Sequence, residues 1–158
     1  MSKPLEVFMQ EAISEARLGL AEGKGGPFGC VIVKGGVVVG KGCNEVLSTN
    51  DPTAHAEIVA IRRACHFLQD FQLAGCDVYT TCEPCPMCLG AIYWSRPDRV
   101  FYAAGREDAA AAGFDDSFIY HELTLRDEQK KIPMIPFMRD AVMELFSTWA
   151  CSPLRRPY

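Results

Sequence analysis

Three cysteines at three-residue intervals occur in the segment TTCEPCPMCLGA, residues 80–91. They are Cys82, Cys85 and Cys88, and one proline lies between each neighbouring pair. Thiols at this spacing suit four kinds of site: a redox pair, an iron–sulfur cluster, a closed structural zinc site, or a catalytic zinc site. The other ligands that the chain supplies decide between them.

The residues around these cysteines predict a helix that begins near Cys85. Pro86 suits the first position of a helix, where a missing N–H costs nothing. Cys85 would then lie at the helix N-terminus and Cys88 about one turn further on. Orphan N–H groups and the positive end of the helix dipole lower the pKa of a thiol there, which favours the thiolate that a metal requires.

A second helix start lies upstream. The segment 51–53 (DPT) combines a capping residue with a proline and predicts a helix whose first turn contains His55 and Glu57. If the two helices begin side by side at the ends of neighbouring strands, His55, Cys85 and Cys88 converge on one point. Three N/S ligands with an open fourth position are typical of catalytic zinc. Glu57 would carry a proton to and from a water on that metal.

The other kinds of site account for fewer of these residues than catalytic zinc does. Cys82 could close a structural zinc site, but it lies on the strand side of the predicted helix, where packing at the strand end explains it. A redox pair of Cys85 and Cys88 leaves His55 and Glu57 without a role. An iron–sulfur site needs a fourth cysteine in register. Glu57 alone could be a surface acid, which the first turn of a helix favours.

Composition narrows the class of protein. The chain has 158 residues, 49% of them apolar and 23% charged, which predicts a single globular domain. Its net charge of −4 argues against a nucleic-acid partner. Acidic residues interrupt residues 1–25, so no signal peptide is expected, and no apolar run is long enough to span a membrane. The eight cysteines are therefore expected to be thiols or metal ligands in a cytoplasmic protein.

The periodicity of apolar residues predicts strands alternating with helices. Glycines in the turn at residues 34–36 join two short apolar runs into a hairpin. Crossover helices must cover both faces of a sheet, so the fold class is α/β, a three-layer α/β/α arrangement with a mixed central β-sheet. The predicted order is helix 5–20, strands 28–33 and 37–40, a helix carrying Ile58, Ile61, Cys65 and Leu68, strand 76–81, helix 86–95 and strand 99–104.

The last third of the chain has a different pattern. Residues 132–150 place Met138, Val142, Leu145 and Trp149 on one helical stripe, with Ala141 as an alternative to Val142. Such a stripe must cover an apolar surface. That surface is either the sheet of the same chain or a partner subunit.

Two segments, DPTAHAE and CEPCPMCLGAIYWSRPDRVFYAA, resemble the cytidine deaminase superfamily, in the branch that holds bacterial guanine deaminases and tRNA adenosine deaminases. They contain the H-x-E and P-C-x-x-C elements of zinc-dependent nucleobase deaminases. The segments GGPFGCVIVK and STNDPTAHAE extend the resemblance. GFDDSFIY is similar to a C-terminal element that guanine deaminases have and the tRNA enzymes lack, so the resemblance to guanine deaminases is the closer one.

The resemblance implies a single cytidine/deoxycytidylate deaminase-type domain, residues 1–158, with the cytidine deaminase-like fold. It implies one zinc ion per chain on His55, Cys85 and Cys88, with water or hydroxide as the fourth ligand, and Glu57 as the proton shuttle. The implied reaction is deamination of a small purine base, guanine, to xanthine. The family's substrate contacts match Phe28, Asn44, the backbone N–H of Ala56, Asp116 and Tyr158, and Trp94 is a further candidate for the pocket.

Guanine deaminases of this type exchange their C-terminal segment between subunits. The resemblance therefore implies a homodimer in which residues 113–158 are swapped, and Asp116 and Tyr158 act in the partner's site. Gly113 would give the chain freedom to cross over. Each substrate residue also has a structural explanation: Asn44 as a turn residue, Phe28 as core, Asp115 and Asp116 as a solvated pair, Tyr158 as a frayed end, and Trp94 as packing between subunits.

Three functions remain open. The first is guanine deamination, with Asp116 assisting proton transfer. The second is deamination of another ring, namely adenosine in tRNA, ammeline or cytosine, although a tRNA enzyme needs a basic surface. The third is a zinc-binding module without catalysis, which predicts the loss of Glu57, and Glu57 is present.

Overall fold

The computed structural model describes residues 5–157. The chain divides into two compact units, Met1–Asp116 and Ser117–Tyr158, which are described separately. No helix among the described residues is long and apolar enough to cross a membrane.

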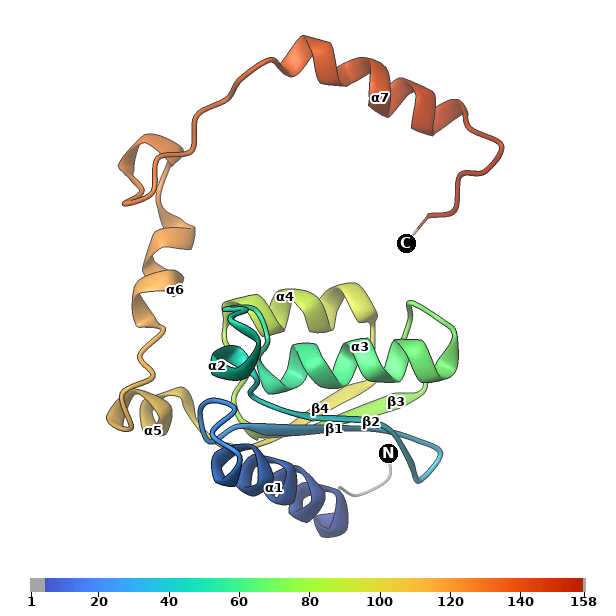
Figure 1. Cartoon of the computed structure of the whole chain (residues 1–158). Coiled ribbons are helices and arrows are strands. Elements are labelled where there is room, and N and C mark those ends of the chain that lie inside the picture. The colour runs from blue at the N-terminus through green and yellow to red at the C-terminus, as the bar shows by residue number, and fades with distance from the viewer. Residues whose placement is uncertain (1–4, 158) are drawn as a thin grey trace. The chain divides into compact units, whose positions relative to one another are not determined.

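The first unit is a mixed four-stranded sheet between helices (Figure 1). The strand order is β2-β1-β3-β4; β1 is antiparallel to β2 and to β3, and β3 is parallel to β4. Helix α1 covers one face, and α3 and α4 cover the other, which confirms the predicted three-layer class. Its elements are α1 (Glu6–Ala21), β1 (Gly29–Lys34), β2 (Val37–Cys43), α2 (Val46–Thr49), α3 (Ala56–Leu68), β3 (Cys76–Cys82), α4 (Pro86–Ser95), β4 (Arg99–Ala104) and α5 (Arg106–Ala111).

The β1–β2 hairpin forms as its sequence predicts. Gly35 and Gly36 have φ angles of 57° and 83°, a left-handed conformation that glycine adopts without a steric penalty. Two consecutive residues with positive φ match the twist of a tight hairpin. The pairing runs from Gly29 opposite Cys43 to Lys34 opposite Val37.

Alternation along β1 divides the core between the two faces of the sheet. Cys30 and Ile32 pack in the cluster that contains α3, and Val31 and Val33 pack in the cluster that contains Phe8 of α1. All four side chains are buried because neighbouring strands cover β1 on both edges and helices cover both faces.

The residues of α3 at the centre of its contact with the sheet are not the predicted ones. Ala56, Ala60 and Ala64 are each fully buried, while the predicted larger residues of this face, such as Ile61 and Leu68, only pack partly against the cluster. Residues four apart lie on one face of a helix, so three alanines form a smooth stripe that brings the helix backbone close to the strands. A Cβ at Gly40 of β2 would lie only 2.6 Å from the Ala60 carbonyl oxygen, so the helix backbone lies directly against this strand.

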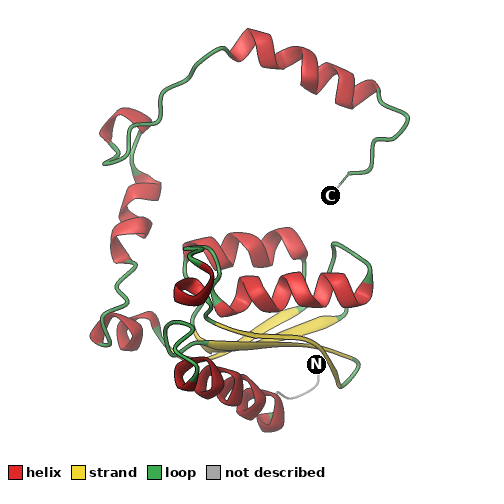
Figure 2. Ribbon diagram, in the orientation of Figure 1, coloured by secondary structure: helices red, strands yellow, loops and turns green. Residues whose placement is uncertain are grey.

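The second unit contains α6 (Ser117–Thr124), the 3₁₀ helix η1 (Asp127–Gln129) and α7 (Arg139–Cys151), as Figure 2 shows by its colours. Met138, predicted to belong to the helical stripe, is the residue before α7 and has a φ of 53°. None of the described residues 117–157 is buried in the isolated chain. The predicted stripe therefore has an exposed apolar face.

Candidate metal centre and active site

The N-termini of α3 and α4 carry the three predicted metal ligands. Cys85 is the N-cap residue of α4, with Pro86 following it as predicted, and Cys88 lies in the first turn. His55 is the N-cap of α3, one residue before the helix. The prediction that His55 lies within the first turn was wrong by that one residue.

The reason is local hydrogen bonding at segment 51–53. The Asp51 side chain accepts hydrogen bonds from the backbone N–H and the hydroxyl of Thr53, at 2.8 and 2.6 Å. These bonds form a turn of the kind that aspartate favours, so this segment forms a turn before α3 and does not begin the helix. The His55 N–H then donates to the Thr53 carbonyl at 2.8 Å, and the helix begins at Ala56.

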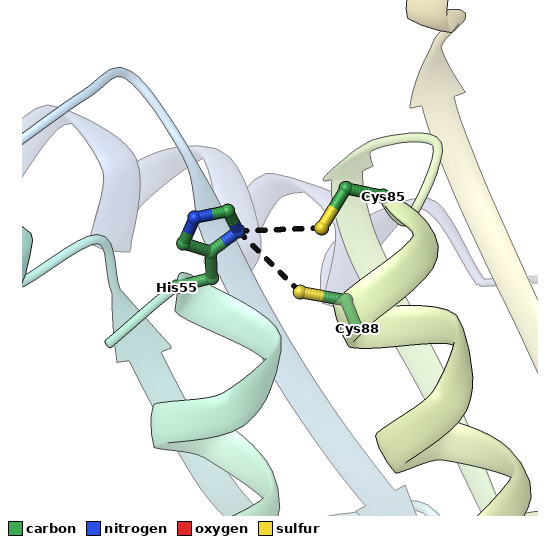
Figure 3. Close-up of side chains that lie close together, drawn as sticks. All are labelled: His55, Cys85 and Cys88. Carbon is green, nitrogen blue, oxygen red and sulfur yellow. Dashed lines mark hydrogen bonds between the residues drawn. The ribbon is translucent and has the colours of Figure 1, made fainter. Parts of the chain in front are cut away.

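The two helix starts bring His55, Cys85 and Cys88 together (Figure 3). The sulfurs of Cys85 and Cys88 each lie 3.5 Å from Nδ1 of His55, and the three ligand atoms lie within 4.8 Å of one another. Cys88 is buried and the other two are half-buried. This is the convergence that the sequence predicts.

The electrostatics of the cluster favour a thiolate. Hydrogen bonds from Cys88 and His55 lower the pKa of Cys85 to about 4. The hydrogen bond with Cys85 and burial raise the pKa of Cys88. The hydrogen bond with Cys85 raises the pKa of His55. The thiolate favoured at Cys85 is the form of cysteine that binds a metal ion.

Two thiols and one imidazole fit zinc. Borderline-soft zinc binds sulfur and nitrogen, and three protein ligands are the number that catalytic zinc sites use. Among residues 5–157, these three form the one group of His, Cys, Asp and Glu side chains with metal-ligand spacing. Cys82 lies outside that group and directs its sulfur to the Gly105 carbonyl, at 3.7 Å. Its position supports the prediction that it is not a ligand.

Glu57 lies beside this cluster. Its side chain is 6% exposed, and burial raises the pKa of the carboxyl group. Oε2 is 3.4 Å from the Cys88 sulfur, so that oxygen is on the side of the metal ligands. Oε1 accepts a hydrogen bond of 2.9 Å from the hydroxyl of Thr80. A carboxyl group with a raised pKa next to a metal centre is suited to accept and return protons.

Asn44 is held at the end of β2. It is 5% exposed; its N–H donates to the Phe28 carbonyl at 3.0 Å, and its Oδ1 accepts the N–H of Val46 at 3.2 Å. The loop residue Gly25 packs directly against it: a Cβ there would overlap the Asn44 side-chain oxygen and lie 2.9 Å from its backbone oxygen. With Oδ1 engaged, the Asn44 amide group remains as a donor.

Phe28 and Asp116 lie in the same unit as the metal ligands. Phe28 packs edge-on against Phe114, with ring centroids 4.9 Å apart. Partial burial raises the pKa of Asp116, and the negative charge of Cys85 in the same chain raises it further. Phe114 therefore packs on Phe28 within the first unit.

The remaining predicted site residues differ in position. Ala56 is buried, and as the first residue of α3 it has an N–H that no carbonyl of the helix can accept. Trp94 is in the last turn of α4, away from Cys85, and is 64% exposed. Tyr158 lies outside the described residues.

Two residues near the site were not predicted from the sequence, Thr80 and Phe114. Thr80 is a polar residue in a strand whose other inward residues are apolar, and that contrast was the available signal. Phe114 precedes the acidic pair and had no pattern to mark it, because its partner Phe28 is distant in sequence.

The fold and the site define the class of protein: residues 2–104 match the cytidine and deoxycytidylate deaminase zinc-binding region, and the chain belongs to this family of zinc-dependent hydrolases. The chain is 53% identical to a guanine deaminase of Bacillus subtilis, over 91% of this chain and 92% of that protein. A crystal structure of guanine deaminase from Bacillus subtilis matches with a TM-score of 0.95 and 49% identity, over 99% of each chain.

A relative with a different activity matches less of the chain. The tRNA-specific adenosine deaminase of Aquifex aeolicus is 42% identical over 63% of this chain and 65% of its own length. The similarity to guanine deaminase thus extends into residues beyond the zinc-binding region, as the segment GFDDSFIY predicts.

Proposed function

We propose that this protein hydrolyses guanine to xanthine and ammonia. The observation that carries this proposal is the similarity to guanine deaminase over nearly the whole chain, which includes the segment around Asp116. The similarity to a tRNA adenosine deaminase covers only 63% of the chain. A net charge of −4 also makes a binding surface for tRNA phosphates less favourable.

The proposed reaction assigns a role to each group of the metal centre. When bound by His55, Cys85 and Cys88, zinc supplies a nucleophile by lowering the pKa of a water. Glu57 would take the first proton of that water on Oε2, the oxygen nearer Cys88, and give it to the purine ring. It would then take the second proton of the same water and give it to the amino group, which leaves as ammonia. Burial supports this role because it raises the pKa of the carboxyl group toward the working pH.

Other side chains would bind the base. Asn44 presents its amide group to an acceptor of the purine ring, and the Ala56 N–H binds a second acceptor. Phe28 stacks on the ring, supported by its edge contact with Phe114. Asp116 holds the departing amino group. Its raised pKa suits a carboxyl group that shares a proton with an amine.

We further propose a homodimer with an exchanged C-terminal segment. A unit without buried residues cannot stabilise itself, because hydrophobic burial is the main favourable term in folding. Residues 117–157 form such a unit, because none of them is buried in the isolated chain. The resemblance implies that the exchanged segment begins at residue 113 and brings both Asp116 and Tyr158 into the partner's site. The packing of Phe114 against Phe28 favours a later start, after Asp116, in which case only Tyr158 would serve the partner.

The cytoplasm is the proposed compartment. All eight cysteines are free thiols in the structure, and thiols persist in a reducing compartment.

One assay tests the substrate. Purified protein is incubated in parallel with guanine, adenine, cytosine, ammeline and a tRNA anticodon hairpin, and ammonia release is measured. We expect guanine to give the highest kcat/KM. A higher value for the hairpin or for another ring would overturn the proposal and name the actual substrate, and no release from any of them would favour a zinc-binding module.

A further inference from the structure

The proposed reaction assigns no role to the hydroxyl of Thr80, which contacts Glu57. Thr80 is in β3, paired with Cys30 of β1 and Tyr102 of β4, and is completely buried. Its hydroxyl donates to Oε1 of Glu57 at 2.9 Å, across 23 positions of sequence. A threonine that served only strand pairing would have no need to direct its hydroxyl at a carboxylate on another element.

The pleat of β3 explains how this contact arises. Side chains two apart in a strand point to the same face, so Thr80 shares its face with Cys76 and Val78. Both of these pack in the cluster that contains α3. Glu57 lies in the first turn of α3, above the end of that face. The strand therefore presents one polar group, Thr80, at the point where the helix presents its carboxylate.

The two oxygens of the Glu57 carboxyl group face different elements. Oε1 lies 2.9 Å from the Thr80 hydroxyl on β3, and Oε2 lies 3.4 Å from the sulfur of Cys88 on α4. A buried carboxyl group is stabilised by hydrogen-bond donors, and a donor on one oxygen restricts the direction in which the other oxygen points.

We propose that Thr80 is a positioning residue, whose hydroxyl holds Oε1 of Glu57 and thereby leaves Oε2 directed at the metal ligands. This inference rests on the proposed function, in which Glu57 transfers the protons. It adds that the two carboxylate oxygens have different tasks: Oε1 anchors the group on β3, and Oε2 exchanges the proton.

The test compares Thr80→Val, Thr80→Ser and the control Thr81→Val. Valine has nearly the shape of threonine without the hydroxyl, and serine keeps the hydroxyl. Thr81 is the next residue of β3, on the opposite face, and its hydroxyl accepts the Gly29 N–H at 3.1 Å. The control therefore removes a neighbouring hydroxyl without touching Glu57. The measurements are kcat and KM for guanine, zinc content, and thermal denaturation to verify folding.

We expect Thr80→Val to lower kcat by about 10- to 100-fold, the usual loss for a group that orients the functional residues of a metal site. KM and zinc content should stay at the wild-type level, because no substrate contact or ligand is removed. Thr80→Ser should recover most of kcat, and Thr81→Val should keep it. If Thr80→Val does not fold, Thr80→Ala takes its place with the same expected result.

A double variant separates positioning from a general structural effect. In a Glu57→Gln chain, adding Thr80→Val should change the residual rate no further, because the group that Thr80 positions is already disabled. Two results would overturn the proposal: a decrease in kcat by the same factor in the wild-type and Glu57→Gln backgrounds, or a wild-type kcat for Thr80→Val alone.

A crystal structure of zinc-loaded Thr80→Val gives a second readout that is independent of turnover. We expect Oε1 of Glu57 to leave its position beside residue 80 in this variant, and to keep its hydrogen bond with Thr80 in Thr81→Val. An unchanged Glu57 would overturn the positioning role. If the wild type fails to deaminate guanine, the proposed function falls, and this structural comparison still decides the role of Thr80.

Discussion

The two units of the chain differ in how they bury apolar side chains. In the first unit, Ile32, Leu73 and Val78 are completely buried between sheet and helices. In the second, Ile135 and Phe137 are 80% and 83% exposed in the isolated chain. The first unit can stabilise itself, whereas the second depends on a surface that it does not contain.

The position of the functional groups follows the same division. The metal ligands, Glu57 and Asn44 all lie in the unit with the buried core, and the three ligand atoms lie within 4.8 Å of one another. The second unit carries an apolar stripe and, at its end, Tyr158. The candidate chemistry therefore lies in the unit that buries its own core, whereas the second unit has an apolar face that the isolated chain leaves exposed.

Removal of a metal ligand tests whether the first unit carries the chemistry, and it has the largest expected effect on activity. His55→Ala and Cys85→Ala should each lose both the metal and all guanine deamination, since a site with two ligands holds zinc weakly. The wild type should contain about one zinc ion per chain by metal analysis. Full activity after complete removal of zinc by a chelator, or absorbance typical of an iron–sulfur cluster, would contradict the metal assignment.

Glu57→Gln separates the proton chemistry from the metal. Glutamine keeps the size of the side chain and cannot carry a proton, so we expect kcat to fall by about 10² to 10⁴-fold. Zinc content and guanine binding should stay at the wild-type level, because Glu57 is not a ligand. Metal analysis and calorimetric titration with guanine check these two properties. Near-normal turnover would show that another group transfers the protons.

The sequence alone predicted the parts of the site that depend on short segments. Pro86 marks the start of α4 and places Cys85 and Cys88 correctly, and the hairpin follows from Gly35 and Gly36. The start of α3 was placed too early, because the side chain of Asp51 forms a turn where a helix cap was expected.

Other features depend on contacts between distant segments. Which residues of α3 meet the sheet was not evident, because large apolar side chains gave a stronger pattern than the alanine stripe at Ala56, Ala60 and Ala64. The bond from Thr80 to Glu57 requires both the pleat of β3 and the approach of α3. Neither is visible in a local pattern of residue types.

Mixing of variant chains tests whether the C-terminal segment serves the partner. A Glu57→Gln chain is exchanged with a Tyr158→Ala chain, and guanine deamination is measured. If Tyr158 enters the partner's site, half the sites of a mixed dimer contain an intact Glu57 and an intact Tyr158, so activity should exceed that of both parents. No gain on mixing would show that the segment serves its own chain.

A second pair locates the crossover. We expect Glu57→Gln mixed with Asp116→Ala to give no gain, because the contact of the neighbouring Phe114 with Phe28 favours a position of Asp116 in the site of its own chain. A gain for this pair as well would show that the exchanged segment begins before Asp116, near Gly113, whose φ of 94° allows a sharp change of direction.

The smallest expected effect concerns the loop that supports Asn44. In Gly25→Ala, the new Cβ would overlap the Asn44 side-chain oxygen, so Asn44 must move away from the position in which we propose that it binds the base. Loss of one neutral hydrogen bond predicts an increase in KM for guanine of about three- to tenfold, with kcat nearly unchanged. Gly90→Ala is the matched control, since a Cβ at Gly90 of α4 meets open space. An unchanged KM in Gly25→Ala would show that Asn44 only supports the fold. A large decrease in kcat would show that the loop also affects the catalytic step.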